Sequence, residues 1–131
     1  MKLSQTTIIT KIHLIVSVII VIPAAFIYGF NVGEFLELNP NSIDEKNFSK
    51  AVMGLYLGFS ILWILGILKL DYLKSALLSN TVFMLALAFG RILSSITDGL
   101  PSEVYILGTL GELILGCYGF WVLNSKYLKK S

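Results

Sequence analysis

The chain has 131 residues, of which 56% are hydrophobic and only 14% are charged. Soluble domains carry roughly 25% charged residues, so this composition excludes an ordinary soluble domain and indicates a membrane protein. The formal net charge of +2 is too small to favour nucleic acid as a partner. The single cysteine, Cys117, excludes an intramolecular disulfide, and we expect no metal site and no cofactor.

Four apolar segments are long enough to cross a bilayer, which takes roughly 20 mostly apolar residues. We predict helices at about 11–30, 43–69, 73–97 and 104–123. In hydrocarbon the backbone polar groups must be paired within the segment or the bundle, so helices are expected rather than open strands. The predicted fold is all-α: a polytopic membrane protein with a four-transmembrane-helix bundle, forming one domain over residues 1–131.

The ends of the first two segments carry recognisable signals. The first segment shares a basic flank and the small pair Ala24-Ala25 with cleaved signal peptides, but its apolar run continues to Phe30. We therefore expect it to be a retained helix. Ser42 and Glu45 have the Ser-x-x-Glu spacing of a capping box, which predicts that the second helix begins near residue 43.

The flanking charges predict one orientation in the membrane. Basic residues gather at the N-terminus, the second connection and the C-terminal tail, whereas the first and third connections are mainly acidic. The basic set is Lys2, Lys11, Lys69, Lys74, Lys126, Lys129 and Lys130, and the acidic set is Glu34, Glu37, Asp44, Glu45, Asp98 and Glu103. Because positive flanks stay cytoplasmic, we expect both termini inside (N-in/C-in) and both acidic connections outside.

Two charged residues lie deep within the apolar segments, Arg91 in the third and Glu112 in the fourth. Charges in such positions are costly and face the interior of the bundle. At 1.5 Å per residue, Arg91 lies roughly 9 Å and Glu112 roughly 13 Å below the outer ends of two antiparallel neighbours. We therefore expect an ion pair between them, which in a bidentate geometry offsets much of the cost of burial. Asp98, two turns above Arg91, is an alternative partner for the guanidinium.

Other polar residues extend this pair into a predicted binding site in the outer half of the bundle. The proposed set is Arg91, Glu112, Asp98, Ser94, Ser95 and Lys50. Each feature also has a plainer interpretation. The pair of Arg91 and Glu112 can be a purely structural clamp. Lys50 can extend to the headgroups, and the two serines can bond their own helix backbone.

Glycines are spaced so that they form stripes along two of the helices. The set is Gly54, Gly58, Gly108, Gly116 and Gly119. Small residues let helices approach closely, so we expect these glycines to contact neighbouring helices, and a homo-oligomer through the glycine faces stays open. Lys50 shares the face of the first two glycines, and Glu112 shares that of the other three. Tyr56 lies on a different face, where it meets another neighbour or lipid, while Tyr28 and Tyr105 fit an interfacial aromatic belt.

Three stretches carry a resemblance to a known family: "FSKAVMGLYLGFSILWILG", "FMLALAFGRILSSITDGLPS" and "LGELILG". They resemble a family of small bacterial four-helix integral membrane proteins classed as a domain of unknown function. The resemblance covers most of the chain from Phe48 onward and implies a bacterial cytoplasmic membrane. It implies the characteristic positions Gly54, Tyr56, Gly90, Arg91, Ser94, Asp98, Gly99, Pro101 and Glu112. Lys50 stands where the family pattern has an arginine, and lysine cannot supply a bidentate fork.

Two classes of function follow. In the first, the chain is a small integral membrane protein whose outward-side polar pocket binds a lipid headgroup or a small polar or anionic ligand, or it serves as an accessory subunit. In the second, it is a small oligomeric transporter or channel with Glu112 as the protonatable coupling residue. No catalytic motif accompanies the polar residues, so we do not expect an enzyme. The first class is favoured, because one fixed orientation and the lack of inverted halves argue against the second.

Overall fold

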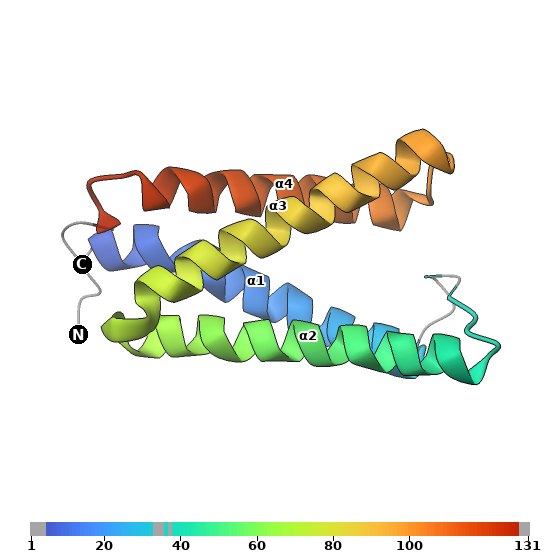
Figure 1. Cartoon of the computed structure of the whole chain (residues 1–131). Helices are drawn as coiled ribbons and strands as arrows, with labels where there is room; N and C mark the ends of the chain where they lie inside the picture. Colours follow the sequence, from blue (N-terminus) through green and yellow to red (C-terminus); the bar gives the residue numbers. More distant parts are fainter. Residues whose placement is uncertain (1–4, 33–35, 37, 129–131) are drawn as a thin grey trace.

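The computed structural model describes residues 5–32, 36 and 38–128, and long helices make up most of it (Figure 1). The elements are α1 (Gln5–Phe30), α2 (Ile43–Leu68), the short 3-10 helix η2 (Leu70–Tyr72), α3 (Leu73–Thr97) and α4 (Glu103–Leu123). The first helix therefore begins at Gln5, ahead of the predicted start near Lys11.

The predicted capping box at the start of α2 is confirmed. The Ser42 hydroxyl accepts a hydrogen bond from the Glu45 backbone N–H at 3.1 Å, and the Glu45 carboxylate accepts one from the Ser42 N–H at 3.0 Å. These two bonds satisfy backbone donors that the first turn of a helix leaves free. At the other end of α2, Lys69 takes an extended conformation and stops the helix.

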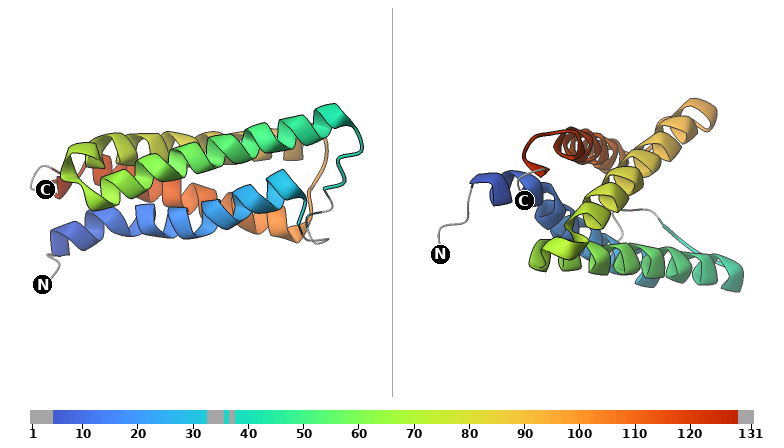
Figure 2. Two further views of the ribbon diagram at one scale, coloured as in Figure 1. Left: turned by 90° about the horizontal axis from the view of Figure 1, so that it is seen from below. Right: turned by 60° about the vertical axis from the view of Figure 1, so that its left-hand side comes forward.

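Consecutive helices run in opposite directions along the bundle (Figures 1 and 2). The most extensive contacts are those of α1 with α2 and of α3 with α4, while α1 and α4 touch each other much less. One end of the bundle holds the connection between α2 and α3, and we call it the α2–α3 end. The opposite end holds the turn between α3 and α4, and we call it the α3–α4 end. Gly99 in that turn has a φ of 110°, a conformation that favours glycine.

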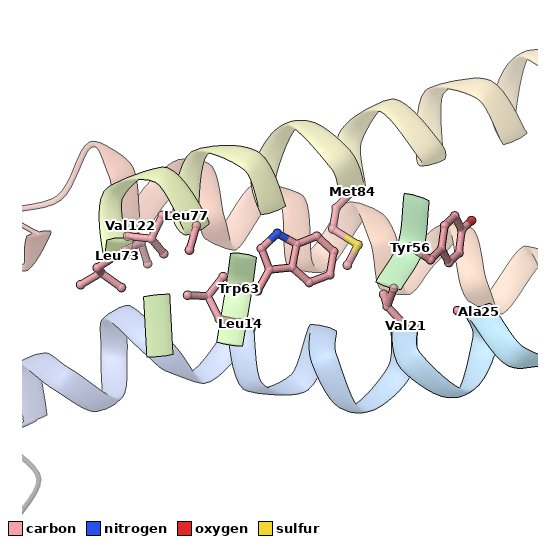
Figure 3. Packing of buried hydrophobic residues seen from close by; sticks show 10 residues of the cluster. Leu14, Val21, Ala25, Tyr56, Trp63, Leu73, Leu77, Met84 and Val122 are labelled. Carbon is pink, nitrogen blue, oxygen red and sulfur yellow. The ribbon is translucent and has the colours of Figure 1, made fainter. Parts of the chain in front are cut away.

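The interior of the bundle contains polar residues as well as a row of apolar ones. Leu14, Trp63 and Leu77 are fully buried in the apolar row, which Figure 3 shows between α1 and α3. His13 and Asn80 are buried as well, whereas many large apolar side chains lie exposed on the outside. An apolar exterior around a partly polar interior suits hydrocarbon rather than water. All four long helices are long and apolar enough to cross a membrane.

Three of the five predicted glycine contacts are absent from the bundle. At Gly116 an added Cβ would come within 2.6 Å of the Leu85 side chain, and at Gly119 it would overlap Thr81, so these two glycines do allow close helix contact. An added Cβ at Gly54, Gly58 or Gly108 would meet no heavy atom within 4 Å. The expectation that these three contact a neighbouring helix of the same chain is therefore wrong. A homo-oligomer through the exposed face of α2 stays a prediction.

Candidate functional site

The centre of the site is the predicted ion pair between Arg91 of α3 and Glu112 of α4. The Nε of Arg91 donates to Oε1 of Glu112 at 3.0 Å. The side chains are 21% and 13% exposed, respectively, so both charges are largely removed from the surface. The predicted contact is present because the short turn between α3 and α4 brings these two residues to the same depth.

The pair has an open, one-point geometry rather than the bidentate one that we expected. Only Nε of Arg91 contacts the carboxylate, while Nη2 donates instead to the hydroxyl of Tyr28 at 3.2 Å. The second carboxylate oxygen, Oε2 of Glu112, is buried and has no hydrogen-bond partner among the described residues. A buried acceptor without a partner costs about 1–3 kcal/mol. The pair therefore offers an acceptor to a further group and leaves several of the five guanidinium N–H donors for it.

Aromatic side chains surround the guanidinium. The Cζ of Arg91 lies 5.3 Å from the ring centroid of Tyr105, a distance at which the cation is attracted to the ring face. The Tyr105 hydroxyl donates to the backbone carbonyl of Leu36 at 3.2 Å, which ties α4 to the connection between α1 and α2. Tyr28 packs edge-on against Tyr56, with ring centroids 5.6 Å apart. Tyr28 and Tyr105 therefore both contact the guanidinium, in addition to Glu112.

Two hollows meet at this arginine. The deep hollow has a volume of about 380 Å³ and extends from Arg91 into the bundle, with Glu112 on its wall. It is lined by Ile20, Val21, Ala24, Ile27, Tyr28, Leu36, Tyr56, Met84, Leu87, Arg91, Val104, Tyr105, Leu107, Gly108, Gly111, Glu112 and Leu115. The terminal hollow, of about 700 Å³, lies at the α3–α4 end of the bundle. It is lined by Tyr28, Leu38, Asn39, Pro40, Asp44, Glu45, Phe48, Ser49, Val52, Tyr56, Arg91 and Tyr105.

The deep hollow is apolar except around the ion pair. Its wall farthest from the α3–α4 end is made by Ile20, Val21, Met84 and Leu115. Beyond these residues the apolar row continues with the fully buried Trp63 and Leu14 (Figure 3). The hollow is therefore a chamber that closes before it reaches the α2–α3 end.

The structure does not bring Asp98 or the two serines into contact with the guanidinium. Asp98 is exposed and accepts a hydrogen bond from the Ser94 hydroxyl at 2.8 Å, so the alternative pairing of Asp98 with Arg91 is absent. Ser95 donates to the backbone carbonyl of Arg91 at 2.8 Å, which is the plainer interpretation of this serine. Ser94 and Arg91 share only a shallow third hollow beside Pro101.

Lys50 does not line either of the two main hollows. Its side chain is exposed and its Nζ lies 5.7 Å from the ring centroid of Phe30. The reason is helical geometry: Lys50 shares a face of α2 with Gly54, and that face is turned outward. The inward face carries Tyr56 instead, which is buried. The prediction that Lys50 contributes to the site is therefore wrong, and Tyr56 takes the place that we had assigned to it.

The tyrosines are the site residues that sequence reasoning missed. Tyr28 and Tyr105 were predicted to form an interfacial belt, but both contact Arg91. A signal was available for Tyr105, because it lies seven residues before Glu112 and therefore on the same face of its helix. No comparable signal pointed to Tyr28, which lies on α1 and is not adjacent to Arg91 in the sequence.

Comparison with known protein families assigns the chain to one of them. Residues 9–123, most of the chain, match the family described as domain of unknown function DUF4345. The chain belongs to this family. The match confirms the resemblance that the three sequence stretches indicated, and the DUF4345 description assigns no activity to its members. No curated protein and no solved structure gives a significant match.

Proposed function

We propose that the chain is a small integral membrane protein that binds a lipid or another small polar ligand at Arg91 and Glu112. The observation that carries the proposal is the open ion pair on the wall of a chamber. Arg91 retains unused donors, and Oε2 of Glu112 is a buried acceptor without a partner among the described residues. A purely structural clamp would be expected to use both oxygens, because that geometry offsets the cost of burial best.

The form of the deep hollow supports the same proposal. Sites for small ligands have volumes of about 300–1,000 Å³ and mostly apolar walls with a few polar groups that orient the ligand. The deep hollow has a volume of about 380 Å³, and its polar groups gather around Arg91 and Glu112. Because the chamber closes at Met84 and Leu115, binding accounts for it better than conduction through the bundle.

We further propose that the α3–α4 end faces away from the cytoplasm, as the charge pattern predicts. Of the described lysines, Lys11, Lys69, Lys74 and Lys126 lie near the α2–α3 end, whereas Lys46 and Lys50 lie at the α3–α4 end with Asp44 and Glu45. Lys2, Lys129, Lys130, Glu34 and Glu37 lie outside the described residues. The membrane is proposed to be the cytoplasmic membrane of a bacterium. A membrane-impermeant maleimide tests this orientation on a Cys117→Ser background: we expect it to label Ser102→Cys in intact cells and to label Ser125→Cys only after lysis.

The binding proposal is tested by filling the deep hollow. Gly108 lines it and has no heavy atom within 4 Å of an added Cβ, so Gly108→Leu places a side chain in the chamber without a backbone clash. Gly58→Leu is the matched control, because Gly58 has the same freedom but lies on the outward face of α2. Both proteins are purified in mild detergent, and the lipid that stays bound is counted by native mass spectrometry. We expect one retained lipid in the wild type and in Gly58→Leu, and none in Gly108→Leu.

The opposite result would show that the chamber holds no ligand. If the wild type and Gly108→Leu retain the same number of molecules and are stabilised equally by added lipid, the ion pair is a structural clamp. If purified protein in vesicles instead carries a solute flux that Glu112→Gln abolishes, the transporter hypothesis replaces the binding proposal.

A further inference from the structure

We infer that the ligand is a zwitterionic phospholipid of the outward-facing leaflet, with its phosphate at Arg91 and its ammonium group near Asp44 and Glu45. This inference rests on the proposed function and specifies the class of lipid. It follows from the order in which apolar, basic and acidic residues line the two connected hollows.

The charges around the hollows disfavour a simple anion. Among the described residues that line the deep and terminal hollows, Arg91 is the only basic one, whereas Glu112, Asp44 and Glu45 contribute three carboxylates. An anionic ligand would be attracted by one cation, Arg91, and repelled by the three carboxylates. A ligand with both charges can place its negative group at Arg91, where Glu112 opposes it as it would any anion, and its positive group near Asp44 and Glu45, which attract it.

The order of these groups along the bundle matches the order within a phospholipid. The deepest part of the site is apolar, Arg91 lies at the junction of the two hollows, and Asp44 lies toward the α3–α4 end. A phospholipid in the outward-facing leaflet has its chains deepest, its phosphate at the edge of the hydrocarbon and its ammonium group farthest out. Arginine is also well suited to phosphate, because several N–H donors can bind neighbouring oxygens.

The terminal hollow has aromatic walls suited to an ammonium group. Tyr28, Tyr56, Tyr105 and Phe48 all line it. Aromatic faces attract cations, and this attraction increases when the cation is removed from water. The carboxylate of Asp44 adds a full negative charge at the same hollow. Together they form an acidic aromatic rim above the arginine.

An acyl chain has a route into the deep hollow from the side. Ile20 and Ala24 of α1 and Leu107 and Leu115 of α4 face the hollow, and these two helices contact each other little. The hollow, at about 380 Å³, accommodates the upper part of one chain rather than a whole lipid. The rest of the molecule therefore stays in the bilayer, and the lipid binds without leaving its leaflet.

The test compares four probes on the purified full-length protein, with dissociation constants measured by native mass spectrometry. They are dioleoyl-phosphatidylethanolamine (zwitterionic), dioleoyl-phosphatidylglycerol (anionic), dioleoylglycerol (without phosphate) and O-phosphoethanolamine (the headgroup alone).

We expect phosphatidylethanolamine to bind tightest. Asp44→Asn should weaken it by roughly two- to fivefold, the range that a solvent-exposed ion pair contributes, because Asp44 is exposed. Asp44→Lys should reverse the preference in favour of phosphatidylglycerol. Asp98→Asn is the matched control, because Asp98 is an exposed carboxylate at the same end that lines neither main hollow.

The outcomes distinguish a failure of the zwitterionic assignment from a failure of the proposed ligand binding in the deep hollow. If phosphatidylglycerol or dioleoylglycerol binds the wild type at least as tightly, and Gly108→Leu still blocks binding, the site exists but the zwitterionic assignment is overturned. Equal binding of O-phosphoethanolamine would overturn the assignment of a membrane lipid. If no probe distinguishes the wild type from Gly108→Leu, both the inference and the proposed function fail.

Discussion

The ion pair allows structural and binding roles to be separated by a double-mutant cycle. The variants are Arg91→Met, Glu112→Leu and the combination of the two, which replaces both charges with apolar side chains of similar size. Removing one partner of a fully buried pair costs about 3–5 kcal/mol, because the other charge is left without its counterpart. Replacing both partners with apolar side chains is often neutral.

The exposure and hydrogen bonds of the two side chains determine how much stability each single variant should lose. Arg91 remains 21% exposed and keeps its bond to Tyr28, so Glu112→Leu should cost about 2–3 kcal/mol, near the value of a charge-assisted hydrogen bond. The Glu112 side chain is only 13% exposed and would lose the one side-chain hydrogen bond that it makes with the described residues, so Arg91→Met should cost about 3–4 kcal/mol. We expect the double variant to lie within about 1 kcal/mol of the wild type.

The assay is unfolding in mixed micelles by titration with SDS, followed by circular dichroism. Lipid binding is measured on the same proteins. We expect the double variant to be folded and yet unable to retain lipid, because the polar groups that orient the ligand are gone. Single effects that simply add in the double variant would refute a direct interaction between Arg91 and Glu112, since residues in direct contact should be coupled. A folded double variant that binds lipid like the wild type would remove the pair from the binding site.

Three further predictions test the contacts around the site. Gly66→Ala should destabilise the bundle by about 1–3 kcal/mol, because the added methyl group would overlap a side chain of α3, whereas Gly58→Ala should stabilise it by up to about 1 kcal/mol through higher helix propensity. SDS titration of both proteins checks the sign of each change. Ser42→Ala should cost about 1 kcal/mol by removing the helix cap, and faster hydrogen exchange confined to the first turn of α2 would show it. Tyr28→Phe should cost about 1 kcal/mol in the wild type and almost nothing in Arg91→Met, because the lost hydroxyl accepts its bond from that arginine. An equal cost in both backgrounds would contradict the contact.

The ion pair at the centre of the site was predictable because α3 and α4 are consecutive helices joined by a short turn. Counting residues from that turn brings Arg91 and Glu112 to the same depth, and the contact between them is present. The capping box was equally accessible, since Ser42 and Glu45 interact within a single turn of helix. Local spacing is enough wherever the partners lie on one helix or on two helices that a turn holds side by side.

The orientation of α2 could not be predicted in this way. Its residues are apolar around most of the circumference, as is usual for a helix that faces both lipid and protein. Hydrophobic periodicity therefore did not show which face is turned inward. The glycine spacing suggested the face of Gly54 and Lys50, but the structure turns Tyr56 inward instead. The volume and shape of the aromatic neighbours on α1 and α3 decided the matter, because Tyr56 packs between Tyr28 and Phe83.

By itself, the sequence determined four helices that are long and apolar enough to cross a membrane, and the depth of the ion pair within them, because these depend on composition, length and helical rise. The tertiary structure alone decided that Tyr28 contacts Arg91. The contact with Tyr28 joins α1 to α3, two helices that are not consecutive, and no spacing along the chain specifies how two such helices rotate about their axes. That rotation depends on how side chains of all four helices fill the space between them. It turns Lys50 outward, brings the tyrosines to the guanidinium and leaves the chamber beside Glu112.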